Sequence, residues 1–356
     1  MTAADSNYLP AACCTLLSCA HDGCAAVNAR YFLLAYDISV QEVENARSFL
    51  KNRGASVEII KIQTQRFRGF RVDDSVTAAT YSKLLLSEYF DDRWGRLLYL
   101  DADTRVMVRL ETLLEAKLHG KVVGAVHDYL QYIIFGMEES RARLGMQTDA
   151  PYFNAGVLCF DWPATIASGL LKRARSFGIE SAHLCISHDQ DALNKAFEGV
   201  WAPLDPRWNF MTVAMPEDIL RLDYPASLRP YISHFAGPLK PWMANFPQRY
   251  ENHLSWYREM LRDSPWPYFV ALTDAPSSAT TKASSAVCLK VWLLAQRRRL
   301  RAALELFLSR QVVAARRPQN TRPRKSPSTE TSDDEANPEL EHLLNLMVAE
   351  ASSSDT

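Results

Sequence analysis

The sequence contains no run of about 18 or more apolar residues, so no segment is predicted to cross a lipid bilayer. No basic stretch precedes an apolar one near the N-terminus, and a secretory signal peptide is therefore not expected. Basic and acidic residues nearly balance at 40 and 41, which leaves no global positive field to attract nucleic acid. These absences predict a cytoplasmic protein and leave attachment to the inner face of the membrane open.

The cysteine spacing typical of a zinc site is also missing. The seven cysteines include no paired CxxC and no Cys/His pattern of the kind that holds zinc. Four of them, Cys13, Cys14, Cys19 and Cys24, crowd one apolar stretch near the N-terminus. The total of seven is odd, and we expect reduced thiols rather than a disulfide framework.

The chain is long and apolar enough to bury a large core. Its 356 residues are 47% hydrophobic, which excludes wholesale disorder. Residues 1–266 alternate short apolar segments with amphipathic ones, the pattern of an α/β sheet flanked by helices. The expected strands are Tyr31–Tyr36, Val57–Ile62, Arg96–Leu100, Lys121–Val126 and Val157–Phe160. The expected helices are Val40–Arg53, Val76–Phe90, Leu110–Leu118, Ala164–Arg175 and Gln190–Phe197.

The composition changes after Trp266. Residues 267–285 are small and polar, as in a linker, and residues 316–356 are too rich in Pro, Ser, Thr and charge to order themselves. Between them, residues 286–315 predict an amphipathic helix with Leu, Trp and Phe on one face and arginines around the rest. The pattern fits equally a helix packed on the catalytic domain and one lying on anionic lipid.

Two carboxylates follow an apolar strand in the segment LYLDADT. In extended backbone, Asp101 and Asp103 lie on one side, where they could hold a hard cation that prefers oxygen ligands. In a nucleotide-binding α/β sheet, the usual partner of such a cation is a diphosphate. Aspartates are also common as turn and cap residues where strands end, so the pair does not decide by itself.

A second group of candidate residues lies in the segment ISHFAGPLKPW. The imidazole of His234 could complete a carboxylate metal site and would favour Mn²⁺ over Ca²⁺, while Lys240 could neutralise a phosphate. Gly237 would let the backbone approach a ligand closely. Taken singly, the histidine fits a structural role and the lysine a solvated surface charge.

Two further segments carry polar groups beside apolar ones. Asn154 and Gly156 open an otherwise apolar strand, which suits contact with a polar ligand but also an ordinary bulge. Asp189 could cap the helix that follows it, or face a sugar together with Gln190.

Seven segments in this order resemble glycosyltransferase family 8, which contains glycogenin and bacterial lipopolysaccharide galactosyltransferases. They are AADSNY, TYSKLLL, LYLDADT, FNAGVLCF, DQDALN, DPRWNF and HFAGPLKPW. The resemblance covers residues 1–266. The resemblance implies one GT-A domain, a mixed, mostly parallel sheet flanked by helices. It also implies a UDP-sugar donor, retention of the anomeric configuration, and Mn²⁺, for which Mg²⁺ is the other candidate.

The resemblance also assigns roles to individual residues. It makes Asp101, Asp103 and His234 the metal ligands. Uridine would be held by Ala3, Asp5, Asn7 and Tyr8, with the tyrosine stacked on uracil. The diphosphate would contact Gly237 and Lys240, and the sugar would face Asn154, Ala155, Gly156, Asp189 and Gln190. Lys83, Ala102 and Asp128 complete the expected donor pocket.

The sequence departs from the family pattern in two places. Lys83 stands where the family usually has arginine, which keeps the charge and loses the bidentate fork. Only four residues precede Asp5, so the first strand is expected to be very short, and the sequence leaves open whether the natural start lies upstream. Both departures concern the donor pocket.

The resemblance favours a retaining transferase that moves glucose or galactose from its UDP derivative to lipopolysaccharide or another surface polysaccharide. The alternatives are a self- or protein-glucosylating enzyme like glycogenin, a UDP-sugar hydrolase, and a non-catalytic UDP-sugar-binding scaffold. Asp189 and Gln190 are the candidates for the catalytic group, and the carboxylate is the better nucleophile. The sequence leaves the hexose, the acceptor and the oligomeric state open.

Overall fold

A computed structural model gives the arrangement of the chain. It describes residues 1–23, 29–73, 77–128, 131, 137–212, 229–237, 240–243, 246 and 250–269. The chain divides into two compact units, residues 1–286 and 287–356, and the described residues all belong to the first. The expected linker at 267–285 lies almost entirely outside the described residues, and the expected helix at 286–315 and tail at 316–356 lie wholly outside them.

The described residues contain short strands in three hydrogen-bonded groups. The strands are β1 (Thr2–Ala4), β2 (Tyr31–Tyr36), β3 (Val57–Ile62), β4 (Arg96–Leu100), β5 (Thr104–Val106), β6 (Val123–His127), β7 (Phe153–Asp161), β8 (Trp201–Pro203), β9 (Phe210–Met211) and β10 (Ile232–His234). Their orders are β1-β2-β3, β4-β7-β6-β8 and β5-β10-β9. Backbone hydrogen bonds from Met1 to Leu98 and Leu100 join β1 to β4.

Parallel and antiparallel pairing both occur. The pairs β1–β2, β2–β3, β6–β8 and β9–β10 are parallel, whereas β7 runs antiparallel to β4 and β6, and β10 runs antiparallel to β5. The expected α/β class is therefore confirmed, with a mixed sheet. The bounds of β2, β3 and β4 are those that the sequence predicts.

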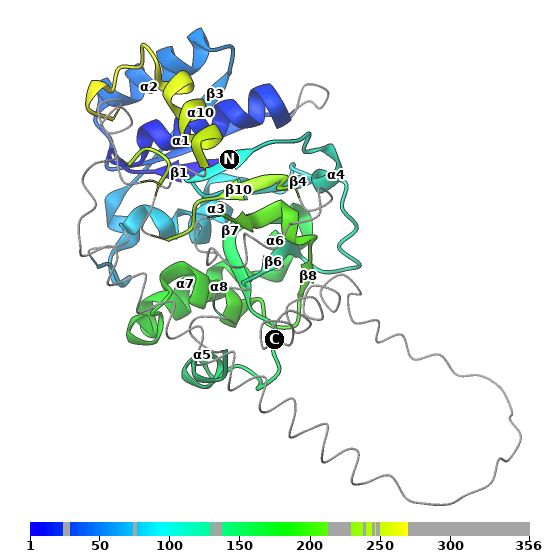
Figure 1. Ribbon diagram of the computed structural model, residues 1–356. Coiled ribbons are helices and arrows are strands. Elements are labelled where there is room, and N and C mark those ends of the chain that lie inside the picture. Colours follow the sequence, from blue (N-terminus) through cyan, green and yellow to red (C-terminus); the bar gives the residue numbers. More distant parts are fainter. Residues whose placement is uncertain are drawn as a thin grey trace, which may run out of the picture. The chain divides into compact units, whose positions relative to one another are not determined.

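Helices surround these strands. The α-helices are α1 (Leu9–Ser18), α2 (Val40–Asn52), α3 (Leu86–Tyr89), α4 (Glu111–Leu114), α5 (Met137–Leu144), α6 (Trp162–Ser168), α7 (Leu170–Glu180), α8 (His188–Ala196) and α10 (Glu251–Leu261). Four segments, η2 (Thr64–Phe67), η3 (Ala78–Leu85), η5 (Ala182–Leu184) and η6 (Pro206–Asn209), are 3₁₀ helices, and η1 (Cys19–Gly23) is a π-helical turn. In Figure 1, α10 from the end of the described chain lies with α1 and α2 from its beginning.

Strand β2 shows why both faces of the sheet are covered. Leu33 and Ala35 pack into a core cluster with α1, α2 and α10, whereas Phe32 and Leu34 pack into a second cluster with η3 and the helices after β7. Side chains alternate between the two faces of a strand, so an unbroken apolar strand must be covered on both sides. The Ser39–Glu42 capping box starts α2 at the edge of the first cluster.

Three predicted helices differ from the structure. The stretch Ala164–Arg175 is divided into α6 and α7 because Gly169 adopts a left-handed conformation with φ of 66°. The stretch Val76–Phe90 is mostly the 3₁₀ helix η3, which is buried along most of its length and so presents no single apolar face. The stretch Leu110–Leu118 shortens to the single turn of α4.

The described cysteines lie in the interior of the protein. The five described cysteines, Cys13, Cys14, Cys19, Cys159 and Cys185, are free and buried. Burial raises the pKa of the Cys185 thiol to about 12 and that of Cys159 to about 11, which keeps both protonated at neutral pH. Within the part of the chain that the structure describes, no helix combines the length and the apolar character needed to cross a membrane.

One buried histidine makes the fold sensitive to acid. The His253 ring packs against Phe235, and its Nδ1 lies 3.2 Å from the Arg105 guanidinium. Burial, with a smaller contribution from the charge of Arg105, lowers the pKa of His253 to about 3. Between about pH 6.5 and pH 3, His253 is therefore protonated in the unfolded chain but neutral in the folded one, so the free energy of unfolding falls as the pH falls.

We expect the titration of His253 to lower the unfolding free energy by about 1 kcal/mol between pH 6.5 and 5.5, and by about 1.4 kcal/mol for each further pH unit down to about pH 3. Urea unfolding at pH 7.5, 6.5 and 5.5 measures this slope. The variant His253→Gln cannot titrate, keeps an acceptor for Arg105, and should lose less stability over the same interval. Equal slopes for the two proteins would show that His253 does not carry the effect.

Candidate functional site

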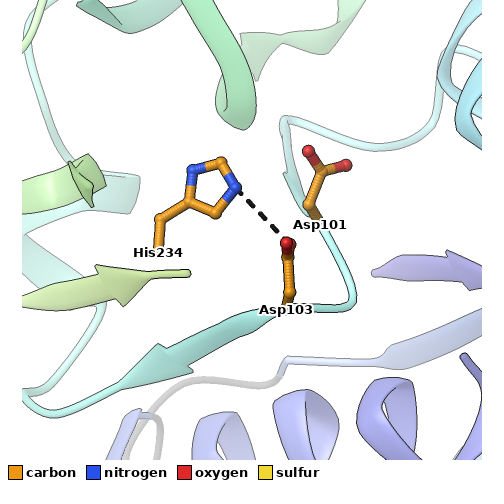
Figure 2. A group of neighbouring side chains, drawn as sticks. All are labelled: Asp101, Asp103 and His234. Carbon is orange, nitrogen blue, oxygen red and sulfur yellow. Dashed lines mark ion pairs between the residues drawn. The ribbon is translucent and has the colours of Figure 1, made fainter. Parts of the chain in front are cut away.

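The two aspartates of the LYLDADT segment and His234 meet at the edge of two strands. Asp101 and Asp103 lie in the turn between β4 and β5, and His234 is the last residue of β10, opposite Thr104 in the antiparallel pairing. One ligand atom from each of the three side chains lies within 4.8 Å of the others. Figure 2 shows the imidazole directed at Asp103, with Asp101 facing the same space. Two carboxylates and an imidazole at this spacing fit a divalent-cation site.

Asp103 is held as a carboxylate by its neighbours. Its Oδ2 accepts a hydrogen bond from the Lys240 ammonium, and its Oδ1 lies 3.4 Å from His234 Nε2. Burial alone would raise the pKa of Asp103, but Lys240 and then His234 outweigh it and hold the pKa well below its ordinary value. Asp103 is therefore ready to bind a cation at neutral pH.

Lys83 connects Asp101 to Asp189. Its ammonium is fully buried and lies 3.0 Å from Asp101 Oδ1, 2.8 Å from Asp189 Oδ2 and 3.1 Å from the Ala155 carbonyl oxygen. Burial would lower the pKa of Lys83, but the two carboxylates raise it above its ordinary value. The ammonium thus donates hydrogen bonds to Asp101 and Ala155 and forms an ion pair with Asp189, so Lys83 is held by the protein on three sides.

The predicted catalytic pair lies in the first turn of α8. Asp189 does not cap this helix, because the N-cap position belongs to Ser187. Asp189 Oδ1 accepts a 2.5 Å hydrogen bond from the Thr80 hydroxyl. The Gln190 side chain donates to Asp128 Oδ2 at 2.9 Å and accepts from the Ala155 N–H at 3.0 Å. Both side chains are thus fixed by η3, β7 and the residue that follows β6.

Strand β7 carries the asparagine and glycine of FNAGVLCF. Asn154 donates to Asp128 Oδ2 at 3.1 Å, and its own Oδ1 accepts from the Gly156 N–H at 2.9 Å. A Cβ at Gly156 would come within 2.2 Å of His234 Cε1. The glycine therefore leaves room for the imidazole ring.

The N-terminal candidates lie beside the Asp–His cluster. Ala3 is in β1, paired with Leu34, and the buried Asp5 accepts a hydrogen bond from the Tyr8 N–H at 3.0 Å. The Tyr8 ring packs edge-on against Trp242. Burial raises the pKa of the Tyr8 hydroxyl, and the Lys240 ammonium opposes this rise. Asn7 is exposed in the turn before α1.

Gly237 and Lys240 lie in the segment after β10. Gly237 has a φ of 97°, a backbone conformation that favours glycine. A Cβ at this position would meet nothing within 4 Å, so the neighbouring atoms do not exclude a larger residue. Lys240 is buried and donates to Asp103 and to the Phe235 carbonyl oxygen at 2.8 Å. The segment thus brings a cation directly against the carboxylate cluster.

The comparison with protein families decides the class of protein. The family described as Glycosyl transferase family 8 matches residues 1–245, more than half of the chain. The chain belongs to glycosyltransferase family 8. It is therefore a glycosyltransferase, and the fold is GT-A.

Individual relatives agree with the family. General stress protein A of Bacillus subtilis is 26% identical over 218 residues, which are 57% of this chain and 73% of that protein. Lipopolysaccharide 1,3-galactosyltransferase of Salmonella typhimurium is 22% identical over 250 residues, 67% of this chain and 70% of that one. The crystal structure of galactosyltransferase LgtC in complex with donor and acceptor sugar analogs is 25% identical, with a TM-score of 0.61 over 75% of this chain and 98% of that one.

Membership of the family gives the site its general chemistry. GT-A glycosyltransferases use nucleotide-sugar donors and a divalent metal, and this glycosyltransferase has the matching Asp–Ala–Asp cluster. The structure brings most of the predicted residues to that cluster or to residues in contact with it. The individual roles of these residues stay predictions.

Sequence reasoning missed three residues that support the glycosyltransferase site. Thr80 donates to Asp189, and Thr15 of α1 hydrogen-bonds the carbonyl oxygens of Ala102 and Thr104 at 2.9 and 2.8 Å. Asn209 contacts His234. Asn209 stands in the DPRWNF segment, so its place in a family motif was the available signal. Thr15 lies inside an apolar helix, where the sequence gives no such signal.

Proposed function

We propose that this glycosyltransferase moves glucose or galactose from a UDP-sugar to a glycan acceptor, with retention of the anomeric configuration and with Mn²⁺. The observation that carries the proposal is the cluster of Asp101, Asp103 and His234 with a buried lysine on each side, Lys83 and Lys240. Carboxylates and imidazole suit a divalent cation, and the Lys240 ammonium suits the phosphates that the cation would accompany.

The donor would extend from the N-terminal turn to α8. We assign uridine to Ala3, Asp5, Asn7 and Tyr8, and the diphosphate to Gly237, Lys240 and the metal. The sugar would lie near Asp128, the segment Asn154–Gly156, and Asp189 with Gln190. In support of this assignment, the charges of Lys240 and Asp103 both act on the Tyr8 hydroxyl, so the base and diphosphate ends of the site are close.

The bound cation would supply Lewis-acid neutralisation of the charge that develops on the departing diphosphate. Lys240 would add a second positive charge there, because its ammonium already lies against Asp103. Lys83 would act through Asp101 and Asp189, because it holds one proposed metal ligand and the proposed nucleophile in place. Burial of these charges strengthens their effect on the reacting bond.

Retention requires either a covalent intermediate or attack from the face that the leaving group vacates. Asp189 is the carboxylate on the sugar side and the preferred nucleophile, and Gln190 is the alternative. Thr80 and Lys83 hold both oxygens of Asp189, so its position is fixed before the donor binds.

We propose lipopolysaccharide or another surface polysaccharide as the acceptor, because relatives bear the names lipopolysaccharide 1,3-galactosyltransferase and lipopolysaccharide 1,2-glucosyltransferase. Such an acceptor would place the enzyme at the inner face of the membrane. The basic amphipathic pattern at 286–315 agrees with this, although these residues lie outside the described part of the chain.

A panel of UDP-sugars with purified protein tests the proposal. We expect one UDP-hexose to release UDP in the presence of Mn²⁺, and a chelator to stop the release until Mn²⁺ is added in excess. Release that rises with an added glycan acceptor identifies a transferase, whereas release independent of any acceptor identifies a hydrolase. Absence of both binding and turnover with every UDP-sugar would refute the donor assignment.

A further inference from the structure

Asn209 lies between the proposed metal site and the proposed sugar site. It is the last residue of η6, directly before β9, and it is fully buried. Its Nδ2 donates to Asn154 Oδ1 at 2.8 Å, and its Oδ1 lies 2.8 Å from His234 Nδ1. Both ends of the amide are therefore satisfied, each by a different part of the site.

The orientation of this amide follows from the backbone. The Gly156 N–H can only donate, so the Asn154 atom that faces it must be the oxygen, and Asn154 Nδ2 then points at the Asp128 carboxylate. Asn209 meets that same Asn154 oxygen, and must present its NH₂ group there. Its own oxygen is left facing His234.

The same logic fixes the proton on the imidazole. An oxygen acceptor at Nδ1 requires the N–H to be on Nδ1, which leaves the lone pair of a neutral ring on Nε2. Nε2 is the atom that faces Asp103, at 3.4 Å (Figure 2). A histidine binds a metal through its unprotonated nitrogen, so the ring already has the tautomer that a cation beside Asp103 requires.

We propose that Asn209 is a positioning residue for the metal site: it holds His234 with the proton on Nδ1 and the lone pair of Nε2 directed at the cation. The inference rests on the proposed function, because it takes the cluster to be a metal site. Hydrogen-bond partners of metal-ligating histidines are typically worth 10–100-fold in metal affinity.

The hydrogen bonds continue from Asn209 to the sugar side. Asp128 Oδ2 accepts from both Asn154 and Gln190, so one line of contacts runs from His234 to the proposed catalytic pair. A shift of the imidazole on metal binding would reach Gln190 through two amides and one carboxylate. The metal and the sugar would then be bound by one connected network.

Titration of Mn²⁺ into the full-length protein, followed by the electron paramagnetic resonance signal of free Mn²⁺, tests the proposal. Asn209→Leu removes both hydrogen bonds and should raise the Kd for Mn²⁺ by about 10–100-fold. Asn209→Asp keeps an acceptor for Nδ1 but loses the donor to Asn154, and should retain more of the affinity than Asn209→Leu. Thermal unfolding of each variant records whether the fold is kept.

The background variant His234→Ala separates positioning from a general structural effect. If Asn209 acts through the imidazole, Asn209→Leu should cost no further Mn²⁺ affinity once His234 is absent. An equal loss in both backgrounds, or an unchanged Kd in the single variant, would overturn the proposal. If the wild-type protein bound no Mn²⁺, the metal part of the proposed function would fail instead.

Nitrogen NMR of the unmodified protein tests the tautomer without any change at Asn209. Ring ¹⁵N shifts distinguish a protonated from an unprotonated nitrogen, and comparison with His234→Gln identifies the signals of His234. We expect the proton on Nδ1 in the metal-free protein. An unprotonated Nδ1 would overturn the inference, whatever the metal titration gives.

Discussion

Replacement of Asp103 by asparagine is expected to lower sugar transfer by at least about 10³-fold, which corresponds to about 4 kcal/mol of transition-state stabilisation. Asparagine keeps the shape of the side chain but loses the negative charge that lies between Lys240 and His234. Without that charge, the metal would lose a carboxylate ligand, and the Lys240 ammonium beside it would no longer be neutralised. UDP release with the preferred donor and the Kd for Mn²⁺ should both report the loss.

Asp149→Asn is the matched control, because Asp149 is exposed and has no part in the carboxylate cluster. Its turnover and Mn²⁺ affinity should equal those of the wild-type protein. A fully active Asp103→Asn enzyme with normal metal dependence would contradict the assignment of Asp103 as a ligand. Loss of turnover with unchanged Mn²⁺ affinity would contradict it as well, and would give the residue another role.

Asp189→Asn should reduce transfer by roughly 10³-fold or more, as expected when a nucleophile is removed. The substitution keeps a side chain between Thr80 and Lys83, so the geometry of the pocket should change little. The affinities for UDP and Mn²⁺ should change by less than about tenfold, because Asp101 still pairs with Lys83. Single-turnover transfer and separate binding titrations measure the two effects.

Asp191→Asn provides the comparison on the same helix. Asp191 is as buried as Asp189 but pairs with Arg143 and accepts from the Tyr152 hydroxyl, away from Lys83. Its variant should lose stability while retaining most of the transfer rate of the folded protein. If Asp189→Asn kept its turnover, Asp189 would have no place in the mechanism and Gln190 would become the candidate.

The sequence predicts the site well where one segment carries both the fold and the chemistry. The apolar run before Asp101 forms β4 with the expected bounds, and a strand that ends in two carboxylates places them in one turn. Asp103 and His234 are far apart in the sequence, so no local pattern predicts their contact. Only the resemblance, through the order of its motifs, places them in one site. The pairing of β10 with β5 is what brings them together.

Other parts of the site follow from tertiary contacts that no local pattern carries. Helix α1 is buried on all sides, so its sequence has no amphipathic period. The resemblance places Lys83 in the donor pocket, but nothing in its segment indicates that its ammonium is buried between two carboxylates. The orientation of Asn209 depends on three other residues and a backbone N–H, a relation that no spacing expresses.

Helix α1 sets the distance between Tyr8 and the Asp–Ala–Asp turn, because Thr15 of this helix hydrogen-bonds the turn. The helix begins directly after Tyr8, and Thr15 binds the carbonyl oxygens on both sides of Asp103. Seven residues of α-helix span about 10 Å, so the interval between the proposed base contact and the metal turn is set by the helical rise. One inserted residue between them would rotate Thr15 by about 100° and detach the turn. The length of α1 therefore sets the spacing between Tyr8 and the Asp–Ala–Asp turn.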